Sequence, residues 1–396
     1  MIEGGEWPLR VTQKMIQMRI TIIGGGISGL STALALNKLG FQCEVYERAK
    51  VLNEVGAGIW MQPNALKVLD WLGLDEAVRE SGVLLDQVDI TNLQLIPFKK
   101  TEKELIQDEK GNKIVAIHRA ALQKILYEAL PNATVKLGYE FNSYEYRENK
   151  LRVSIGDKEI VTDLLIGADG INSKVRNKTF SNTSKRFSGQ TCWRGISDIG
   201  LPTEYQNSGI ESWGNKIRFG FSQIAENQVY WFAVVNTKQS KSDSTDTIKS
   251  ELQQLYKGFH PLVLKIIDHT ETTKIITSDL SDLKRLDTWY KEKVVLVGDA
   301  AHATTPNMGQ GAGQALEDAY YLANILAKTN QIEQTLGLFE SSRREKVDYV
   351  VNNSWRFGKM AHSSFGQPIM KAIMKWTPEK VMKQQMKKLY SIQETF

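Results

Sequence analysis

The sequence predicts an α/β protein in which a Rossmann-like domain is joined to a second domain built on an antiparallel sheet, with helices at the C-terminus. Two observations support this class. Three short apolar runs each end in a glycine-containing turn, beginning at Gly24, Gly167 and Gly298, and each leads toward a helical pattern, as in doubly wound sheets. Residues 186–236 instead alternate in side-chain character, which is typical of antiparallel strands.

The first turn has the spacing of a dinucleotide-binding loop. Residues 19–23 form a β-rich apolar run that enters G-x-G-x-x-G at Gly24, Gly26 and Gly29. The first glycine permits a tight turn, the second lets a pyrophosphate approach the backbone, and the third lets helix and strand pack closely. Residues 30–39 then predict a helix, whose N-terminal N–H groups would face the pyrophosphate.

A second predicted strand, residues 41–46, brings an acid to the same place. Glu47 stands at its end and follows Gly29 by 18 residues, close to the spacing of about 20 expected for the acid that binds a ribose hydroxyl. A glycine-rich turn without a ligand is the alternative, but the order of strand, helix, strand and acid favours a dinucleotide. FAD, NAD and NADP all use this unit, so the loop alone leaves the choice open.

The other two turns each place an acid after a predicted strand. Residues 163–166 precede Asp169, with a helix expected from Ser173, and residues 293–297 precede Asp299. Such an acid is well placed to accept a hydrogen bond from a sugar hydroxyl. The predicted helix of residues 309–327 has a glycine-rich entrance, which offers N–H groups to a ring carbonyl or a phosphate. Two ordinary strand-to-helix turns are the alternative.

With these motifs the chain resembles the single-component FAD-dependent aromatic monooxygenases of the p-hydroxybenzoate hydroxylase fold. Within them it is most similar to the group of salicylate hydroxylase, FAD-dependent urate hydroxylase and zeaxanthin epoxidase. The resemblance spans roughly residues 18–350, and its specific segments are 24–29, 47–48, 54–59 with 63–65, 118–119, 167–176, 192–195 and 298–319.

The resemblance implies a non-covalent FAD site. Glu47 would bind the adenosine ribose, Asp169 both FAD and NAD(P)H, and Asp299 the ribityl chain, while His302 is expected to be an ordinary buried histidine. The full set of expected cofactor-binding residues is Gly24, Gly26, Ser28, Gly29, Glu47, Arg48, Gly58, Arg119, Asp169, Asp299, Gly309, Gly311 and Ala312.

The alternating segment predicts a substrate pocket. Period-2 spacing groups Arg218 with residues 220 and 222, and Tyr230 with Phe232 and residue 234 on the next strand. The resemblance implies that these are the pocket side, together with Arg194 and Ile196, and that Pro306 lies beside the reacting face of the flavin. The alternative is that Tyr230 and Phe232 are core and that Arg218 is a surface charge.

The function implied is FAD-dependent monooxygenation. NADPH or NADH would act as a transient reductant, and O₂ would give a flavin C4a-(hydro)peroxide that hydroxylates or epoxidises a flat aromatic or conjugated small molecule. The alternatives are a halogenase-like or reductase-like FAD enzyme, a plain NAD-dependent dehydrogenase, and a non-catalytic FAD-binding protein. The halogenase signature W-x-W-x-I-P is absent, and residues 193–197 are the nearest segment.

The domain organisation expected is discontinuous. The FAD-binding domain would comprise residues 18–92, 112–185 and 282–345, and the substrate-binding domain residues 93–111 and 186–281. Within the latter we expect one helix over residues 248–267 and a strand near 274–278. Residues 346–396 form a helical region, and residues 1–17 are expected to be a mobile extension.

Composition limits the other possibilities. A net charge of +5 over 396 residues, without basic blocks interleaved with aromatics, does not indicate nucleic acid. The two cysteines and five histidines lack metal-ligand spacing, and the few cysteines favour a reducing compartment, so a cytoplasmic location is expected. A monomer or homodimer is expected. The C-terminal region combines apolar positions at 369, 370, 373, 374 and 376 with lysines. A helix packed across both domains is favoured over one lying on a membrane.

Overall fold

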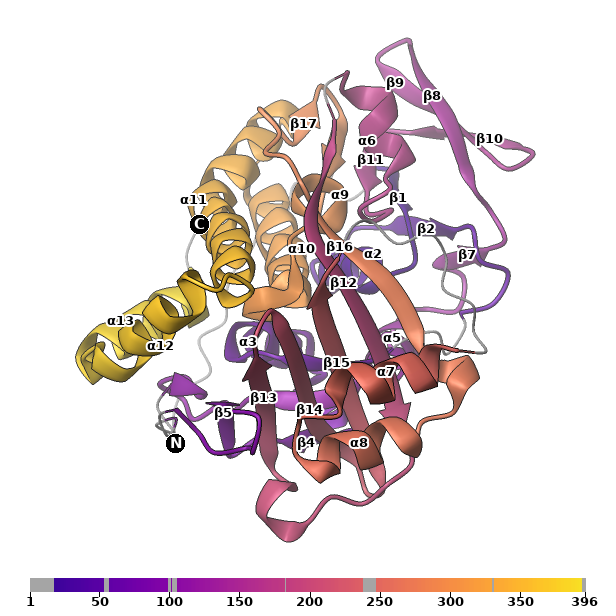
Figure 1. Cartoon of the computed structure of the whole chain (residues 1–396). Coiled ribbons are helices and arrows are strands. Elements are labelled where there is room, and N and C mark those ends of the chain that lie inside the picture. Colours follow the sequence, from indigo (N-terminus) through magenta and orange to yellow (C-terminus); the bar gives the residue numbers. More distant parts are fainter. Residues whose placement is uncertain are drawn as a thin grey trace, which may run out of the picture.

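The computed structural model describes residues 18–52, 57–98, 101, 105–181, 183–237, 247–329 and 331–393. The extension expected at residues 1–17 and the segment 54–56 lie outside these ranges. Figure 1 shows a molecule with one sheet-and-helix layer above a long antiparallel sheet, and with the C-terminal helices projecting at one side. None of the described helices is both long and apolar enough to cross a membrane.

The first six-stranded sheet confirms the predicted Rossmann-like core. Its order is β17-β18-β11-β1-β2-β7, and all neighbours are parallel except β17 and β18. β1 and β11 are buried at every residue, as expected of strands covered on both faces. The bounds are β1 Ile20–Ile23, β2 Cys43–Glu47, β7 Val135–Leu137, β11 Leu164–Gly167, β17 Tyr290–Lys291 and β18 Val294–Leu296.

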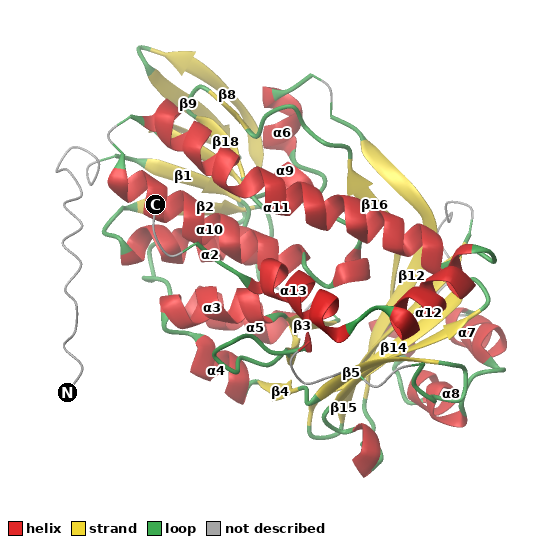
Figure 2. Cartoon of the chain, turned by 90° about the vertical axis from the view of Figure 1, so that its left-hand side faces the viewer, coloured by secondary structure: helices red, strands yellow, loops and turns green. Residues whose placement is uncertain are grey.

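Helices and two small sheets complete this layer. Figure 2 shows α2 and α10 lying side by side, with α11 alongside α10. These helices are α2 Ile27–Lys38, α3 Pro63–Leu72, α4 Asp75–Glu80, α5 Arg119–Glu128, α6 Lys174–Thr179, α9 Asp299–His302, α10 Gly311–Lys328 and α11 Ile332–Ala361. One small sheet contains β3 Gly58–Met61, β4 Gly82–Leu84 and β6 Val115–His118; the other contains β8 Phe141–Arg147, β9 Lys150–Ile155 and β10 Lys158–Thr162.

The second six-stranded sheet has the order β16-β12-β15-β14-β13-β5. Its neighbours are antiparallel except β13 and β5. Phe219, Phe221 and Trp231 pack against α7 and α8 on one face, which leaves the other face to the first domain. The bounds are β5 Gln87–Thr91, β12 Lys185–Ser197, β13 Ser208–Gly214, β14 Ile217–Ala225, β15 Gln228–Asn236, β16 Ile276–Leu283, α7 Ile248–Tyr256 and α8 Pro261–Asp268.

One expectation about this domain needs correction. The helix expected over residues 248–267 is two helices, because Pro261 begins α8 and the His260 side chain accepts a hydrogen bond from Leu262 N–H as its cap. The domain division itself stays a prediction, but β5 pairs with β13. We therefore propose placing the boundary expected after residue 92 ahead of β5.

The C-terminal region is helical, as predicted, but it does not begin at residue 346, which lies inside the 30-residue α11. It continues with α12 Gly366–Trp376 and α13 Glu379–Tyr390. The prediction that the apolar side chains of α12 pack across both domains is wrong for most of them. Ile369, Ile373 and Trp376 are exposed, whereas Met370 is buried. The side chain of Met374 is outside the described residues. Short 3-10 helices occur at η2 Thr203–Tyr205, η3 Thr272–Lys274 and η4 Pro306–Met308.

Candidate active site

The three glycine turns, far apart in sequence, meet in the structure at the carboxyl ends of β1, β11 and β18. Gly24 adopts a φ of 112° and lies so close to the carbonyl of Ala168 that a side chain there would collide with it. Gly29 packs in the same way against the Gly24 carbonyl. A crevice outside the carboxyl ends of parallel strands is where α/β sheets bind their ligands.

Glu47 occupies the position that its spacing predicted. Its Oε2 accepts a hydrogen bond from Gly25 N–H at 2.6 Å, and its Oε1 accepts one from Ala49 N–H at 2.9 Å. The loop is braced from the other side by Gln123, whose Nε2 donates to the Gly25 carbonyl at 2.7 Å. Gly26, by contrast, has open space where a side chain would project, which leaves room for a phosphate beside the N-terminus of α2.

Ser28 tests whether these residues fit a dinucleotide. Its hydroxyl oxygen is buried and has no hydrogen-bond partner within the protein. It lies 2.6 Å from the position that a Cβ atom on Gly298 would occupy, so it sits where the first and third turns meet. An unsatisfied buried hydroxyl is costly, and a polar group of a bound cofactor would satisfy it. The site therefore fits the FAD that the sequence implies.

Asp299 and Arg119 face the same crevice. Both side chains are exposed, with Asp299 at the start of α9 and Arg119 at the start of α5. The protein packed around Asp299 raises the pKa of its carboxyl group, against the opposing charges of His302 and Arg119. The Asp299 side chain can therefore be reached from the crevice, although the surrounding protein displaces part of its hydration shell. Such a carboxylate is suited to accept hydrogen bonds from sugar hydroxyls.

A buried ionic cluster holds the Asp299 turn in place. Asp318 on α10 accepts hydrogen bonds from Gly298 N–H at 2.8 Å and from Arg343 Nε at 2.9 Å. Arg343 also pairs with Glu317. Beside this cluster, Asn64 donates to Gln310 Oε1 at 3.0 Å, which orders the start of α10. The expected cofactor residues at the start of α10 are at least partly accessible to a ligand: Gly309, Gly311 and Ala312.

Asp169 has a local role that the sequence analysis did not foresee. Its Oδ2 accepts hydrogen bonds from the N–H groups of Lys174 at 2.7 Å and Val175 at 3.2 Å, and its Oδ1 accepts one from the Ser173 hydroxyl. It therefore stabilises the first turn of α6. Direct contact of Asp169 with FAD or NAD(P)H stays a prediction.

The second sheet supplies an aromatic wall. Register pairs Phe232 with both Arg194 and Gly220, and Tyr230 with both Ile196 and Ser222, so the period-2 grouping of these residues is confirmed. The Phe232 ring fills the space above Gly220, and the Tyr230 ring packs against Gly58 so closely that a side chain there would collide. The absence of a side chain at Gly58 therefore leaves space for the Tyr230 ring.

Trp60 belongs to this wall and was missed by the sequence analysis. Its indole N–H donates to the Ser222 hydroxyl at 2.8 Å, and its ring meets that of Phe232 edge-on at 6.3 Å between centroids. Its place beside Gly58 in the short segment 58–61 was the available signal. Arg194 lies at the edge of the wall, partly accessible, and donates to Ser278 Oγ at 3.3 Å.

Arg218 does not sit as a substrate anchor would. Its side chain is 3% exposed and forms an ion pair with Glu211 at 2.8 Å. It also donates to Asn307 Oδ1 at 2.7 Å and to His362 Nε2 at 3.3 Å. Each of its nitrogens is thus engaged by the protein, and we assign Arg218 to the junction of β14, η4 and α11 instead. Neighbouring Pro306, at the start of η4, is exposed.

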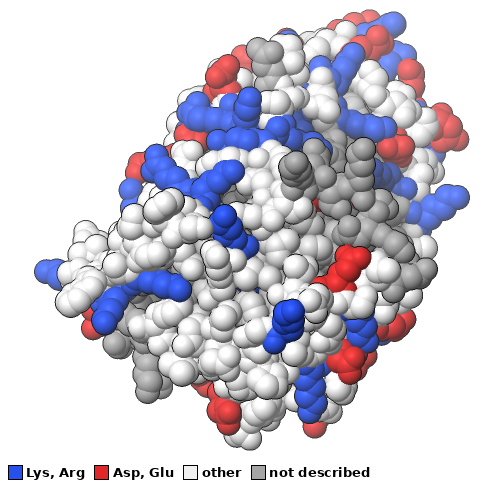
Figure 3. Space-filling model, viewed as in Figure 1, with Lys and Arg blue, Asp and Glu red and all other residues white. Residues whose placement is uncertain are grey.

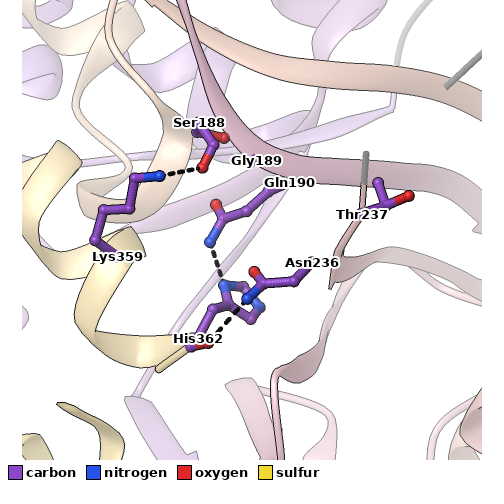
Figure 4. Close-up of a pocket in the computed structure, with 7 residues that line it drawn as sticks. All are labelled: Ser188, Gly189, Gln190, Asn236, Thr237, Lys359 and His362. Atoms are coloured by element: carbon purple, nitrogen blue, oxygen red, sulfur yellow. Dashed lines mark hydrogen bonds between the residues drawn. The ribbon is translucent and has the colours of Figure 1, made fainter. Parts of the chain in front are cut away.

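A separate polar cavity of about 400 Å³ lies near this junction. Figure 4 shows its lining residues on β12, at the end of β15 and at the C-terminal end of α11. The Lys359 ammonium donates to the Ser188 carbonyl, and His362 forms hydrogen bonds with Gln190 and Asn236. None of the expected cofactor or substrate residues lines it. Within the described residues, no group of three or more His, Cys, Asp or Glu side chains could hold a metal ion.

Comparison with known proteins agrees with this geometry. The family model of an FAD binding domain matches residues 17–354. Aurachin C monooxygenase/isomerase of Stigmatella aurantiaca is 34% identical over 92% of this chain and 94% of its own length. The 2-heptyl-3-hydroxy-4(1H)-quinolone synthase of Pseudomonas aeruginosa is 30% identical over 87% and 89%.

Solved structures agree in fold. Klebsiella pneumoniae HpxO, crystallised with FAD and uric acid, superposes with a TM-score of 0.86 at 24% identity, over 94% of this chain and 96% of that one. The helices and the two large sheets of this chain therefore adopt an arrangement that has been seen with FAD.

Proposed function

The chain belongs to the FAD-binding-domain family of flavin-dependent monooxygenases, and from this premise we propose that it oxygenates a flat nitrogen heteroaromatic of the quinolone type. FAD is its cofactor, and the predicted resemblance to this family is confirmed. NADPH or NADH as electron donor, the substrate class and the residues at the site belong to the proposal.

One observation carries the proposal: Arg119 interacts electrostatically both with Asp299 in the crevice and with Tyr230 of the aromatic wall, so the crevice and the wall lie close together. Trp60, Tyr230 and Phe232 form that wall, and aromatic rings favour offset or edge-on packing against a flat ring system. One relative supports a quinolone-type substrate, since it is a 2-heptyl-3-hydroxy-4(1H)-quinolone synthase and is 30% identical to this chain.

Bound FAD, once reduced by NAD(P)H, would supply the activated oxygen. The protein then has to hold the cofactor and exclude water from the reaction. In the proposal, the Gly24–Gly29 turn and the N-terminus of α2 bind the pyrophosphate, Ser28 donates its otherwise unpartnered hydroxyl, Glu47 binds the adenosine ribose, and Asp299 accepts from the ribityl chain.

Arg194 and Tyr230 would orient the substrate. Burial raises the pKa of Tyr230 to about 12, although Arg194 beside it favours ionisation. The phenol therefore stays protonated at neutral pH and can donate a hydrogen bond to a ring oxygen. Arg194 can hold an anionic or enolate-like oxygen through its guanidinium fork, which would favour the deprotonated form of the substrate, whose ring is richer in electrons than that of the neutral form.

A substrate panel under ¹⁸O₂ tests the proposal. The purified holoenzyme is incubated with 4(1H)-quinolones, with purines and with a saturated aliphatic control, using NADH and NADPH in separate reactions. Faster NAD(P)H oxidation with a quinolone, together with one ¹⁸O atom in the product, supports it. Oxidation of NAD(P)H that no aromatic compound accelerates would favour a non-catalytic FAD-binding protein. If an ¹⁸O-labelled product forms from a purine but from no quinolone, the quinolone class is rejected.

A further inference from the structure

Helix α12 presents an apolar stripe to solvent. Phe365, Ile369, Ile373 and Trp376 are 87%, 54%, 53% and 77% exposed. At 100° per residue these four positions fall within an arc of about 80° of the helix surface. Met370, on a neighbouring side of the helix, is buried against Trp213, so α12 is anchored to the body of the protein while the stripe faces outward.

The same segment carries the net charge of the chain. Residues 366–390, which comprise α12 and α13, contain six lysines and one acid, Glu379, a net charge of +5. The whole chain has 50 basic and 45 acidic residues, so 44 of each remain outside the segment, and the rest of the molecule is neutral in sum. The six lysines are Lys371, Lys375, Lys380, Lys383, Lys387 and Lys388.

The two features lie together on a projecting part of the molecule. Figure 1 shows α12 and α13 extending from the body beside the end of α11, and Figure 3 shows blue side chains next to uncharged surface on that projection. Lys387 and Lys388 form ion pairs with Glu109 and Glu345 outside the segment, so the excess positive charge lies mainly nearer the stripe. A second copy of the chain would be a poor occupant, because joining two such stripes face to face would bring Lys371, Lys375 and Lys380 of both copies together.

We propose that α12 and α13 form a peripheral membrane-binding element for anionic lipid surfaces. An apolar stripe with Trp and Phe, bordered by lysines, is the pattern of helices that lie in the interface plane of a bilayer. Anionic headgroups attract such a lysine cluster, and tryptophan prefers the interfacial region. The contact is shallow and reversible. It would bring the enzyme to the membrane surface and leave the crevice unchanged.

Vesicle binding by the full-length holoprotein tests the proposal. We expect co-sedimentation with vesicles of phosphatidylglycerol and phosphatidylcholine, little with phosphatidylcholine alone, and loss at high salt. The double variant Ile373→Ser/Trp376→Ser should lower the partition coefficient about tenfold or more, since apolar contact with the bilayer is removed. Leu255→Ser/Leu338→Ser is the matched control, because both leucines are exposed on other helices at 46% and 44%, and it should bind like the wild type.

Charge and fluorescence variants separate the two contributions. Lys375→Glu/Lys380→Glu should abolish binding at low salt, and the control pair Lys178→Glu/Lys257→Glu, both exposed elsewhere, should not. Trp376→Phe should keep binding but lose a lipid-induced blue shift in emission. FAD content and urea midpoint should stay at wild-type values in all of these variants.

Three results would overturn the proposal. One is absence of binding to anionic vesicles by the wild-type protein. Another is equal loss of binding in the control pairs. The last is lipid-free self-association, measured by light scattering, that Ile373→Ser/Trp376→Ser abolishes, since the stripe would then be covered by a second copy of the chain.

Discussion

The carboxylate of Asp318 lies 2.6 Å from Nε2 of His302, and both side chains are buried. Burial alone would raise the pKa of Asp318, but the charges of His302 and Arg343 and the Gly298 N–H outweigh it, and the pKa is lowered. The carboxylate thus stays ionised and ties α10 to the turn that carries Asp299. His302 is buried, as the sequence analysis expected, and it positions this turn.

We predict that Asp318→Asn strongly destabilises the fold. The change removes the negative charge that Arg343 and His302 share in the interior, and breaking a buried ion pair typically costs about 3–5 kcal/mol. Urea denaturation measures the free energy of unfolding. Asp70→Asn, an exposed aspartate on α3, is the control and should shift it by no more than about 0.5 kcal/mol. Equal effects of the two variants would reject the role given to Asp318.

Asp299→Ala should weaken FAD binding while the fold survives. A carboxylate that accepts from a sugar hydroxyl contributes about 1.5–3 kcal/mol, so the Kd for FAD should rise roughly ten- to hundredfold. Titration of the apoprotein with FAD, followed by flavin fluorescence, gives the Kd. Asp299→Asn keeps a carbonyl acceptor and should fall between the wild type and Asp299→Ala. An unchanged Kd in Asp299→Ala would remove Asp299 from the site.

Alanine variants of the two arginines of the second sheet should affect different quantities: catalysis for Arg194 and stability for Arg218. Arg194→Ala should lower kcat/KM for the best substrate by about tenfold or more, since one charge-assisted hydrogen bond is lost, with little change in thermal stability. Arg218→Ala should instead lower the free energy of unfolding by about 3 kcal/mol, because it leaves Glu211 with an unpaired charge in a largely buried position. Unchanged kcat/KM in Arg194→Ala would refute its contact with substrate, and a fully stable Arg218→Ala would refute the junction.

His362 should make stability fall in mild acid. Burial and the nearby positive charge of Arg218 lower its pKa from 6.5 to about 3, so below pH 6.5 the unfolded chain takes up a proton that the folded protein does not. The folded state should lose about 2 kcal/mol between pH 6.5 and 5, at about 1.4 kcal/mol per pH unit. His362→Gln should flatten this slope, and His269→Gln, an exposed histidine, should retain it.

The first domain could be predicted well because its signals are local. The strand expected at residues 41–46 is β2 Cys43–Glu47, and the strand at 293–297 is β18 Val294–Leu296. Each is fixed by a short apolar run and the turn that follows it. Pro261 was an equally local signal for the start of α8, but the sequence analysis expected one continuous helix across it.

Contacts between distant segments could not be predicted in the same way. Alternation placed Arg218 on the correct face of β14, but its partners Glu211, Asn307 and His362 come from three other segments. The apolar spacing of α12 likewise predicted a stripe but not its surroundings. The packing of Met370 against Trp213 and the hydrogen bond from Gln367 Nε2 to the Gly214 carbonyl show which side of that helix faces the protein.

The flavin released from purified protein tests the central claim most directly. The crevice formed by the Gly24, Asp169 and Asp299 turns should hold FAD without a covalent bond, so the protein should be yellow as isolated or after reconstitution. Acid or heat denaturation should release FAD, identified by mass, at close to one molecule per chain. A colourless protein that cannot be reconstituted with FAD, or one that releases FMN instead, would contradict the account.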